Sequence, residues 1–295
     1  MIPKSIVIGK DRQEIVQPAM INFPLKFIVQ EFSPHTYQFI DWHWHDAVQY
    51  CFVNNGTITF QIGQYRESVP QGDGLFINSQ QVHTAFPQSP GSTYFCLNLP
   101  CSLIGPEGTT MFHRFAAPLL FQSRFAFLPF HQTDPDAAAV LTCLKRCCKR
   151  SLKGKELFDL ELLADLILLW NHTLNFLPKN TAEKPALGKT NERIQGILTY
   201  ISKNYAQQIT LEQIAAAIHV SRNECSRIFH SVTGQPLFSY LTAFRIAKSI
   251  NLLLKTEKSI SEIAYETGFC NQSYYTQRFK LKEGLSPNQF RKKFK

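Results

Sequence analysis

The last third of the chain repeats one pattern. The two copies are LEQIAAAIHVSRNECSRIFHSVTG (211–234) and ISEIAYETGFCNQSYYTQRFKLKEG (260–284). Both contain an Ile-Ala pair, a short turn, a polar segment ending in Phe and a closing Gly. The Ile-Ala pairs are offset by 49 positions, whereas Gly234 and Gly284 are offset by 50, so the second turn contains one extra residue, which we assign to Cys270. The repeat indicates that the chain uses one supersecondary unit twice.

Short motifs mark where helices begin in and after the two copies. In each motif a Ser or Thr precedes a Glu or Gln by three residues, the spacing of a capping box, in which each side chain bonds the other residue's backbone N–H. The pairs are Thr210–Gln213, Ser221–Glu224, Ser259–Glu262 and Ser286–Gln289. Their spacing predicts two helix-turn-helix units, the last motif starting a further helix with Pro287 at its first position.

The second helix of each unit has an apolar face and a polar face. In the first copy the apolar spacing i, i+3, i+4, i+7 is met by Cys225, Ile228, Phe229 and Val232. The polar faces hold groups that can bond base edges or phosphates. These are Arg222, Asn223, Ser226, Arg227 and His230, and then Gln272, Ser273, Thr276, Gln277 and Lys280, each 50 positions after its counterpart. An ordinary solvated face is the alternative, but such faces carry Glu as freely as Lys, and only Glu224 occurs here.

The charge is unevenly distributed along the chain. Residues 191–295 contain 15 Lys and Arg against 7 Asp and Glu, a net charge of +8, whereas the rest of the chain has a net charge of only +1. A basic third beside a nearly neutral remainder favours a polyanionic partner such as DNA.

A third helix is expected between the two units, over PLFSYLTAFRIAKSINLLLK (236–255). Its apolar stripe is Leu237, Tyr240, Leu241, Phe244, Ala247, Ile250 and Leu254. A continuous helix would hold the units at a fixed separation, so that their second helices enter successive major grooves about 34 Å apart. Arg245 and Lys248 either contact phosphates or are simply solvated.

The first two thirds of the chain have a different pattern. Residues 26–99 contain short segments rich in β-branched and aromatic residues, separated by turn sequences such as NNG and QGDG. They predict a small antiparallel barrel or sandwich, followed by helices at 134–149 and 155–175. The strands expected are KFIVQ, TYQFID, AVQYCFV, TITFQIG, GLFIN and YFCLNL. The fold class is therefore α+β, with a domain over 1–178, a linker over 179–190 and an all-α domain over 191–295.

The all-α domain resembles the AraC/XylS-type DNA-binding domain. The resemblance rests on ITLEQIAAAIHVSRNECSRIF, TGQPLFSYLTAFRIAKSINLL and SISEIAYETGFCNQSYYTQRFKLKEGLSPNQFRKKF, nearly the whole C-terminal third. It implies seven helices that bind promoter DNA, and an activator that touches RNA polymerase. It also implies base contacts at Asn223, Ser226, Arg227, Gln272, Ser273, Thr276 and Gln277. At the position of Gln277 many relatives have Arg.

The N-terminal domain resembles, less specifically, the cupin-type sensor domain of the same family. Metal-binding cupins have His-x-His and then a Glu four residues on; His43 and His45 match, but Gln49 replaces the Glu. In the second cupin motif Leu75 stands where a His is expected, and His83 comes eight residues later. Since a metal site needs three or four suitable ligands, we expect no metal and no cofactor. We expect His43, His45, Gln49 and His83 to bind an organic effector or, almost as readily, to serve as structural residues.

These observations predict a cytoplasmic transcription regulator with no catalytic residues. Its expected partners are double-stranded promoter DNA, RNA polymerase and a small-molecule effector. Residues 134–175 are candidates for homodimerisation, because their apolar stripe, which in the second helix is Leu160, Leu163, Ile167 and Trp170, exceeds what a small barrel needs. No apolar run is long enough for a signal peptide or a membrane span. Two alternatives stay open: a metal-dependent cupin enzyme with a DNA-binding tail, and an effector-independent dimeric activator.

Overall fold

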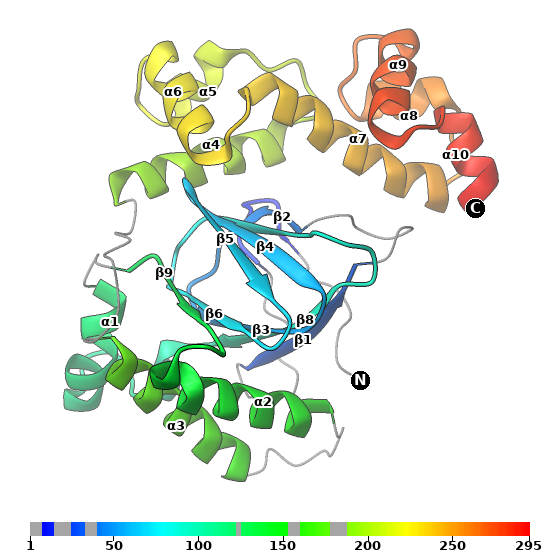
Figure 1. Cartoon of the computed structure of the whole chain (residues 1–295). Helices are drawn as coiled ribbons and strands as arrows, with labels where there is room; N and C mark the ends of the chain where they lie inside the picture. The colour runs from blue at the N-terminus through cyan, green and yellow to red at the C-terminus, as the bar shows by residue number, and fades with distance from the viewer. Residues whose placement is uncertain (1–7, 15–24, 33–39, 122–124, 153–159, 178–187) are drawn as a thin grey trace. The chain divides into compact units, whose positions relative to one another are not determined.

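The structure, a computed structural model, describes residues 8–14, 25–32, 40–121, 125–152, 160–177 and 188–295 (Figure 1). It contains two compact units, Met1–Asn191 and Glu192–Lys295. Most of the linker predicted at 179–190 lies outside the described residues. So do residues 36–39 of one predicted strand and residues 155–159 of the second predicted helix.

The described part of the first unit contains two antiparallel sheets. One sheet has the order β1 (Lys26–Glu31), β8 (Thr93–Leu99), β3 (Val48–Asn55), β6 (Gly74–Ile77) and β9 (Phe127–Phe130). The other has the order β2 (Ile40–His43), β7 (His83–Pro87), β4 (Thr57–Ile62) and β5 (Tyr65–Pro70). The α+β fold class and the antiparallel N-terminal architecture predicted from the sequence are confirmed.

Strand β3 is buried on both faces. Tyr50 and Phe52 belong to the core shared with the helices, whereas Cys51 and Val53 belong to the core between the sheets. Strand β8 alternates in the same way. Because successive side chains of a strand point to opposite faces, a strand covered on both sides has an almost continuous apolar sequence. This explains why the sequence identifies AVQYCFV and YFCLNL so clearly.

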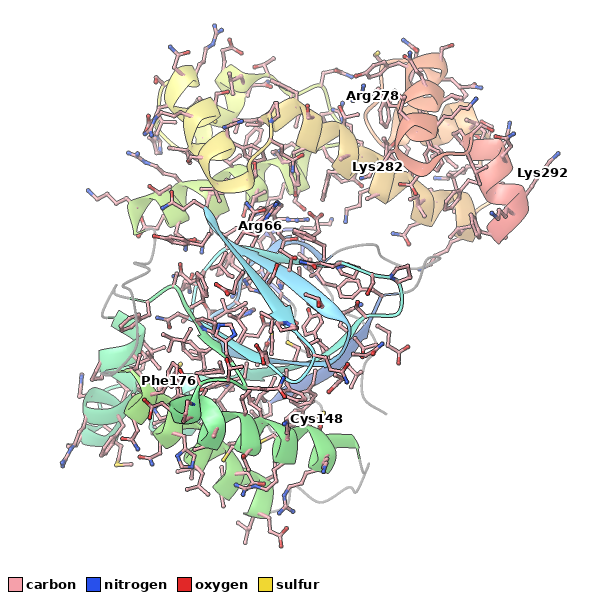
Figure 2. The ribbon with its side chains drawn as sticks, in the orientation of Figure 1. Arg66, Cys148, Phe176, Arg278, Lys282 and Lys292 are labelled. Atoms are coloured by element: carbon pink, nitrogen blue, oxygen red, sulfur yellow. The ribbon has the colours of Figure 1, made fainter. Side chains whose placement is uncertain are left out.

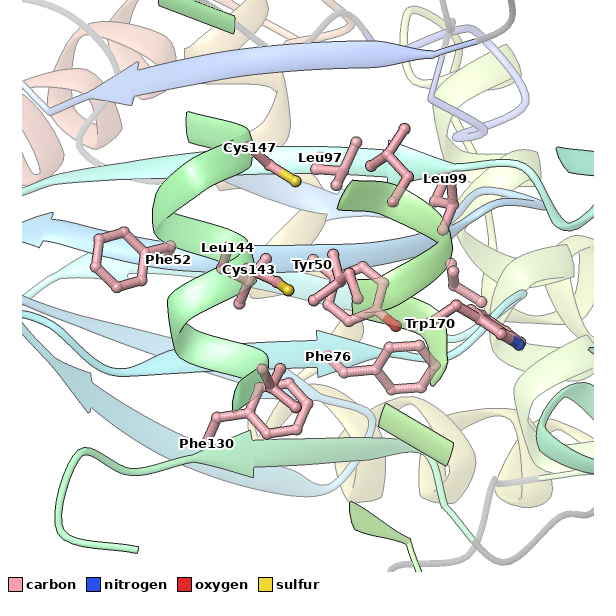
Figure 3. Packing of buried hydrophobic residues seen from close by; sticks show 14 of the residues in the cluster. Tyr50, Phe52, Phe76, Leu97, Leu99, Phe130, Cys143, Leu144, Cys147 and Trp170 are labelled. Carbon is pink, nitrogen blue, oxygen red and sulfur yellow. The ribbon is translucent and has the colours of Figure 1, made fainter. Parts of the chain in front are cut away.

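Two helices cover the outer face of the five-stranded sheet (Figure 3). These are α2 (Ala138–Leu152) and α3 (Leu160–Phe176), close to the predicted ranges. Polar bonds accompany the apolar contacts: the Tyr50 hydroxyl lies 2.8 Å from Thr173 Oγ1, and the Trp170 indole donates to the carbonyl of Phe115 at 2.8 Å. The three cysteines of α2 lie in this core as small buried apolar side chains: Cys143, Cys147 and Cys148.

Three strands were not predicted. Strand β5 has the sequence YRESVP, and its outward residues are polar because one face of this edge strand is solvated. Strands β7 and β9 have only five and four residues, too few for a clear alternation. Long-range pairing with β4 and β6 forms them, and that pairing has no local sequence pattern.

The predicted stripe of α3 has the wrong register. Of its four positions only Trp170 is buried; Leu160 is 81% exposed and Ile167 is 50% exposed. The face toward the sheet is formed instead by Leu162, Asp165, Leu166, Leu169, Trp170, Thr173 and Phe176. The helix is apolar on both sides, so the period alone does not identify the inner face.

The second unit contains seven helices within residues 188–295. They are α4 (Lys189–Asn204), α5 (Leu211–Ala217), α6 (Arg222–Thr233), α7 (Leu237–Lys255), α8 (Ile260–Glu266), α9 (Gln272–Glu283) and α10 (Pro287–Phe294). The predicted pair of helix-turn-helix units is α5–α6 and α8–α9. A continuous α7 joins them (Figure 1).

Helix α7 changes its buried face halfway along. In its first half Tyr240 and Phe244 are buried as predicted, but in its second half the buried residues are Ile246, Ser249 and Leu253. The predicted Ala247, Ile250 and Leu254 are one position too late. A shift of one residue rotates the buried face by about 100°, and the rotated face packs on the second helix-turn-helix unit. By length and composition α7 could cross a membrane, but its apolar residues form the core of this unit.

We expect the ion pairs between α2 and α3 to stabilise the first unit unequally. Asp165 is buried and accepts from Arg146 at 2.7 Å and from Arg150 at 2.8 Å, whereas Glu161, which also pairs with Arg150, is exposed. Asp165→Ala should lower the free energy of unfolding by about 2 kcal/mol, because it removes charge-assisted bonds at a buried carboxylate. The control, Glu161→Ala, should cost at most about 1 kcal/mol. Denaturant unfolding followed by tryptophan fluorescence measures both; equal losses would contradict the assignment.

Candidate nucleic-acid interface and histidine cluster

The two helix-turn-helix turns have equivalent geometry. His219 and Gly268, offset by 49, both have positive φ, +55° and +86°. Each next residue, Val220 or Phe269, donates its N–H back to the Ala of the preceding Ile-Ala pair. The caps that follow, Ser221 and Asn271, are offset by 50. The extra residue of the second turn is therefore Cys270, as the repeat predicts.

The predicted helix starts are confirmed, with one change. Three capping boxes are complete, those beginning at Thr210, Ser259 and Ser286. At Ser221 the side chain accepts from the Glu224 N–H, but the Glu224 carboxylate is directed to arginines. Arg227 donates to it through Nε at 2.9 Å and Nη2 at 2.7 Å, and Arg193 lies at 3.4 Å.

Both polar rows lie opposite the buried faces of their helices; Figure 2 draws the side chains around the ribbon of α6 and α9. On α6, Arg222, Asn223, Ser226 and Arg227 are exposed; on α9, Gln272, Ser273, Gln277 and Lys280 are exposed and Thr276 is partly buried. The apolar faces opposite, with Phe229 and Phe279, are buried. Each row is therefore available to a partner at no cost in core packing.

The arginines of the first row take part in surface ion pairs. Arg222 is 2.8 Å from Glu212 on α5, and Arg227 is paired with Glu224. The two arginine side chains are 64% and 70% exposed, and pairs so exposed contribute only about 0–1 kcal/mol. A phosphate or guanine that replaces the carboxylate therefore meets little resistance.

Arg245 has a structural role. Its guanidinium donates to the carbonyl of Tyr205 at 2.8 Å and to that of Gln207 at 2.7 Å, across the turn after α4. These bonds satisfy two carbonyls of the turn between α4 and α5. The geometry of Arg245 therefore supports neither of the two interpretations from the sequence, phosphate contact or simple solvation. Lys248 lies with its ammonium 5.0 Å from the ring of Phe244.

The structure brings three of the four predicted effector residues together. His43 and His83 are paired across β2 and β7, and His45 follows two residues after His43. All three are only 1% exposed, and their nitrogen ligand atoms lie within 4.8 Å of one another. His83 thus points into the cluster, although in the sequence it comes eight residues after the position at which the second cupin motif has its histidine.

Backbone carbonyls orient the three rings. Nδ1 of each histidine lies 2.8 Å from a carbonyl oxygen, that of Asp41, Ala47 or Gln81. A carbonyl can only accept, so each Nδ1 carries a hydrogen, and the neutral ring presents an Nε2 lone pair to the cluster. Burial, then His43 and His45, lower the pKa of His83 well below its usual value. Burial therefore disfavours the charged form of this imidazole.

Gln49 is not one of the converging groups. Its amide donates to Cys96 Sγ at 2.8 Å and to Asn98 Oδ1 at 3.1 Å, and Asn98 in turn donates to Glu14 Oε2 at 2.7 Å. Glu14 Oε2 lies 4.0 Å from His43 Nε2, and the Glu14 side chain is fully buried. Glu14 and Asn98 were not predicted, because neither belongs to a motif. Glu14, in the segment KDRQEI, has no regular spacing from the histidines.

Comparisons with known proteins match two separate parts of the chain to two families. Residues 24–167 match the family described as AraC-like ligand binding domain, and residues 214–293 match a helix-turn-helix domain family. The chain is 28% identical over 293 residues to the HTH-type transcriptional regulator YdeC of Bacillus subtilis (strain 168), covering 98% of this chain and 99% of that protein. It is 34% identical over 99 residues to the melibiose operon regulatory protein of Escherichia coli (strain K12), covering 34% of this chain and 33% of that protein. A structure of ToxT from Vibrio cholerae aligns with a TM-score of 0.46 at 14% identity, covering 90% of this chain and 97% of that chain.

We expect the turn before α9 to require glycine. A Cβ on Gly268 would lie 2.2 Å from the carbonyl oxygen of Tyr205, and its φ is +86°. Gly268→Ala should destabilise the second unit by at least about 2 kcal/mol, from the left-handed backbone and the overlap together. His219→Gly, at the equivalent exposed position, should change stability by less than about 1 kcal/mol. Hydrogen exchange of the α9 amides measures both effects; protection retained in Gly268→Ala would contradict this reading of the turn.

Proposed function

We propose, on the premise that this chain belongs to the AraC family of transcriptional regulators, that it reads promoter DNA through the outer faces of α6 and α9. The observation that supports this most is the exposure of both polar rows on helices that begin from equivalent turns. Arg222, Asn223, Ser226 and Arg227 would contact one major groove, and Gln272, Ser273, Thr276, Gln277 and Lys280 the next.

The two rows suit different bases. The first contains arginines, whose forked guanidinium matches O6 and N7 of guanine, whereas the second contains glutamines, which match N6 and N7 of adenine. We therefore expect the half-site under α6 to be richer in G·C pairs than the half-site under α9. Helix α7 supports this division, because one continuous helix holds both reading helices at a fixed spacing.

The N-terminal unit is the ligand-binding domain, and we propose that ligand control acts through its histidine cluster. Of the residues predicted to contact an effector, His43, His45 and His83 are buried together in one cluster, and the buried Gln49 bonds Asn98, which holds Glu14 beside His43. We also propose an activator that contacts RNA polymerase and acts in the cytoplasm. The absence of disulfides supports the location, since all eight cysteines are free. No catalytic role is proposed, in keeping with the regulator names of the relatives.

We propose that α3 pairs two copies of the chain. Its outer face exposes three large apolar side chains, Leu160, Ile167 and Leu168, the last at 43%. Residues 160 and 167 lie two turns apart on the same side, and 168 lies beside 167. A two-fold pairing would cover the same face in both chains and remove this apolar surface from water.

Arg227→Ala should weaken binding to the specific site by about 1–3 kcal/mol and relax the preference at one base pair, if Arg227 reads a base. Arg66→Ala removes the same charge from an exposed position on β5, outside the DNA-binding unit, and is the matched control. Equilibrium binding to a set of single-base site variants, at two salt concentrations, measures the effect. A uniform loss over all sites with a shallower salt slope would show that Arg227 contacts only phosphate.

Ile167→Glu should convert the dimer to a monomer, because it places a charge in an apolar interface. Met111→Glu, which changes another exposed apolar residue (53% exposed) away from α3, should leave the assembly unchanged. Sedimentation equilibrium at micromolar concentration distinguishes the two masses. A wild-type chain that is already monomeric would refute the pairing.

A further inference from the structure

We propose that the histidine cluster, with Glu14 as the fourth ligand, binds one divalent first-row transition-metal ion. This deepens the proposed ligand control by naming the class of ligand. Only the biological role of the ion rests on the proposed function, because residues of the first unit alone form the ion site.

The neutral histidine cluster has buried hydrogen-bond acceptors that lack a donor. Nε2 of His45 and Nε2 of His83 are buried and have no hydrogen-bond partner in the described structure. Nδ1 already holds the hydrogen of each neutral ring, so these nitrogens present lone pairs to one another. Buried acceptors without a donor cost about 1–3 kcal/mol each. A metal cation bound by these lone pairs would remove this cost.

The size of the space favours a single ion. Three atoms within 4.8 Å of one another can all lie about 2.8 Å or less from a common centre. Ring shifts of less than about 1 Å would bring this distance to the 2.0–2.1 Å of a zinc–imidazole bond. A cation at this centre would be bound by the lone pairs of all three imidazoles.

Glu14 supplies the charge that Gln49 lacks. Its buried carboxylate lies 4.0 Å from His43 Nε2, and one carboxylate partly offsets the charge of a dication among neutral imidazoles. Its place is fixed by the backbone: the N–H of Glu14 donates to the carbonyl of Trp44, the residue between His43 and His45, at 2.8 Å. The N–H of Trp44 donates to Arg12 at 3.2 Å, and Arg12 forms an ion pair with Asp41 at 3.0 Å.

The outer contacts also suit a metal site. Ligand histidines usually donate their second ring N–H to a carbonyl or carboxylate, which fixes the tautomer. Here all three Nδ1 atoms have a backbone carbonyl at 2.8 Å, and Glu14 is held by Asn98, which Gln49 supports. The amide at position 49 is thus an outer-sphere group. This proposal replaces the sequence prediction of no metal, which assumed that position 49 and position 75 had to supply ligands.

The test is Co²⁺ binding by the full-length, chelator-treated protein in the absence of DNA. We expect one equivalent of Co²⁺ per chain, with visible d–d absorption. The proton spectrum should contain three exchangeable, paramagnetically shifted signals, because each ligand ring keeps its Nδ1–H. This readout needs no substitution, so it is independent of whether a variant folds. No stoichiometric uptake, or uptake without shifted N–H signals, would overturn the proposal.

Two pairs of variants assign the ligands. His83→Gln should weaken Co²⁺ binding at least about 100-fold, since loss of outer-sphere groups alone costs 10–100-fold; the exposed His113→Gln should stay within about twofold of the wild type. Glu14→Gln, which keeps an oxygen for Asn98, should weaken binding at least about tenfold, and the exposed Glu107→Gln should not. Unchanged affinity in His83→Gln overturns the site, and unchanged affinity in Glu14→Gln overturns the fourth ligand.

The same measurement separates the two proposals. If the protein takes up no Co²⁺ but still binds operator DNA, the ion site is refuted and the DNA-binding function stands. Co²⁺ uptake by a chain that binds no operator leaves the ion site intact. Circular dichroism of the metal-free variants checks their fold, and His45→Gln repeats the ligand test if His83→Gln does not fold.

Discussion

The DNA-binding unit depends on apolar contact along both halves of α7. Tyr240 packs against Phe229 of the first helix-turn-helix unit, and in the second half Ser249 accepts a hydrogen bond from the buried Tyr275 of the second unit at 2.9 Å. Because the buried face rotates by one residue between the two halves, each unit is held on a different side of one rigid helix. The mutual orientation of α6 and α9 is therefore set by core packing, and their polar rows are left outside. A protein that contacts two major grooves needs this fixed orientation, because an error in the spacing of its two helices affects all base contacts together.

Local features were predictable because each is determined by nearby residues. Capping pairs, closing glycines and the apolar spacing of α6 depend on residues within about two turns, and they hold in the structure except for the Glu224 half of one capping box. The register of α3 and of the second half of α7 was wrong for the opposite reason. Both helices are apolar on more than one side, and the sequence does not state which side a distant element will cover.

The three histidines were named from the sequence, but their meeting with one another and with Glu14 was not predictable, for a topological reason. His43 and His83 meet through the antiparallel pairing of β2 with β7, and β7 has too little periodicity to be recognised as a strand. Glu14 reaches the cluster through a backbone bond to Trp44, which no spacing rule encodes. The comparison with cupins covered only the positions of the two cupin motifs. In the structure His83 and Glu14, which lie outside those positions, are beside His43.

Successive side chains of β3 and β8 point to opposite faces of the sheet, so these two strands connect the buried polar site to the helices on the other face. On β3, Gln49 faces the site, while the next residue, Tyr50, faces the helices and bonds Thr173 of α3. On β8, Asn98 holds Glu14, while Leu97 and Leu99 pack under α2 and α3. A side chain cannot move on one face of a close-packed strand without moving its neighbours on the other. A ligand that draws the three imidazoles and Glu14 inward would thus act on the same two strands that seat α3, the helix whose outer face exposes Leu160 and Ile167.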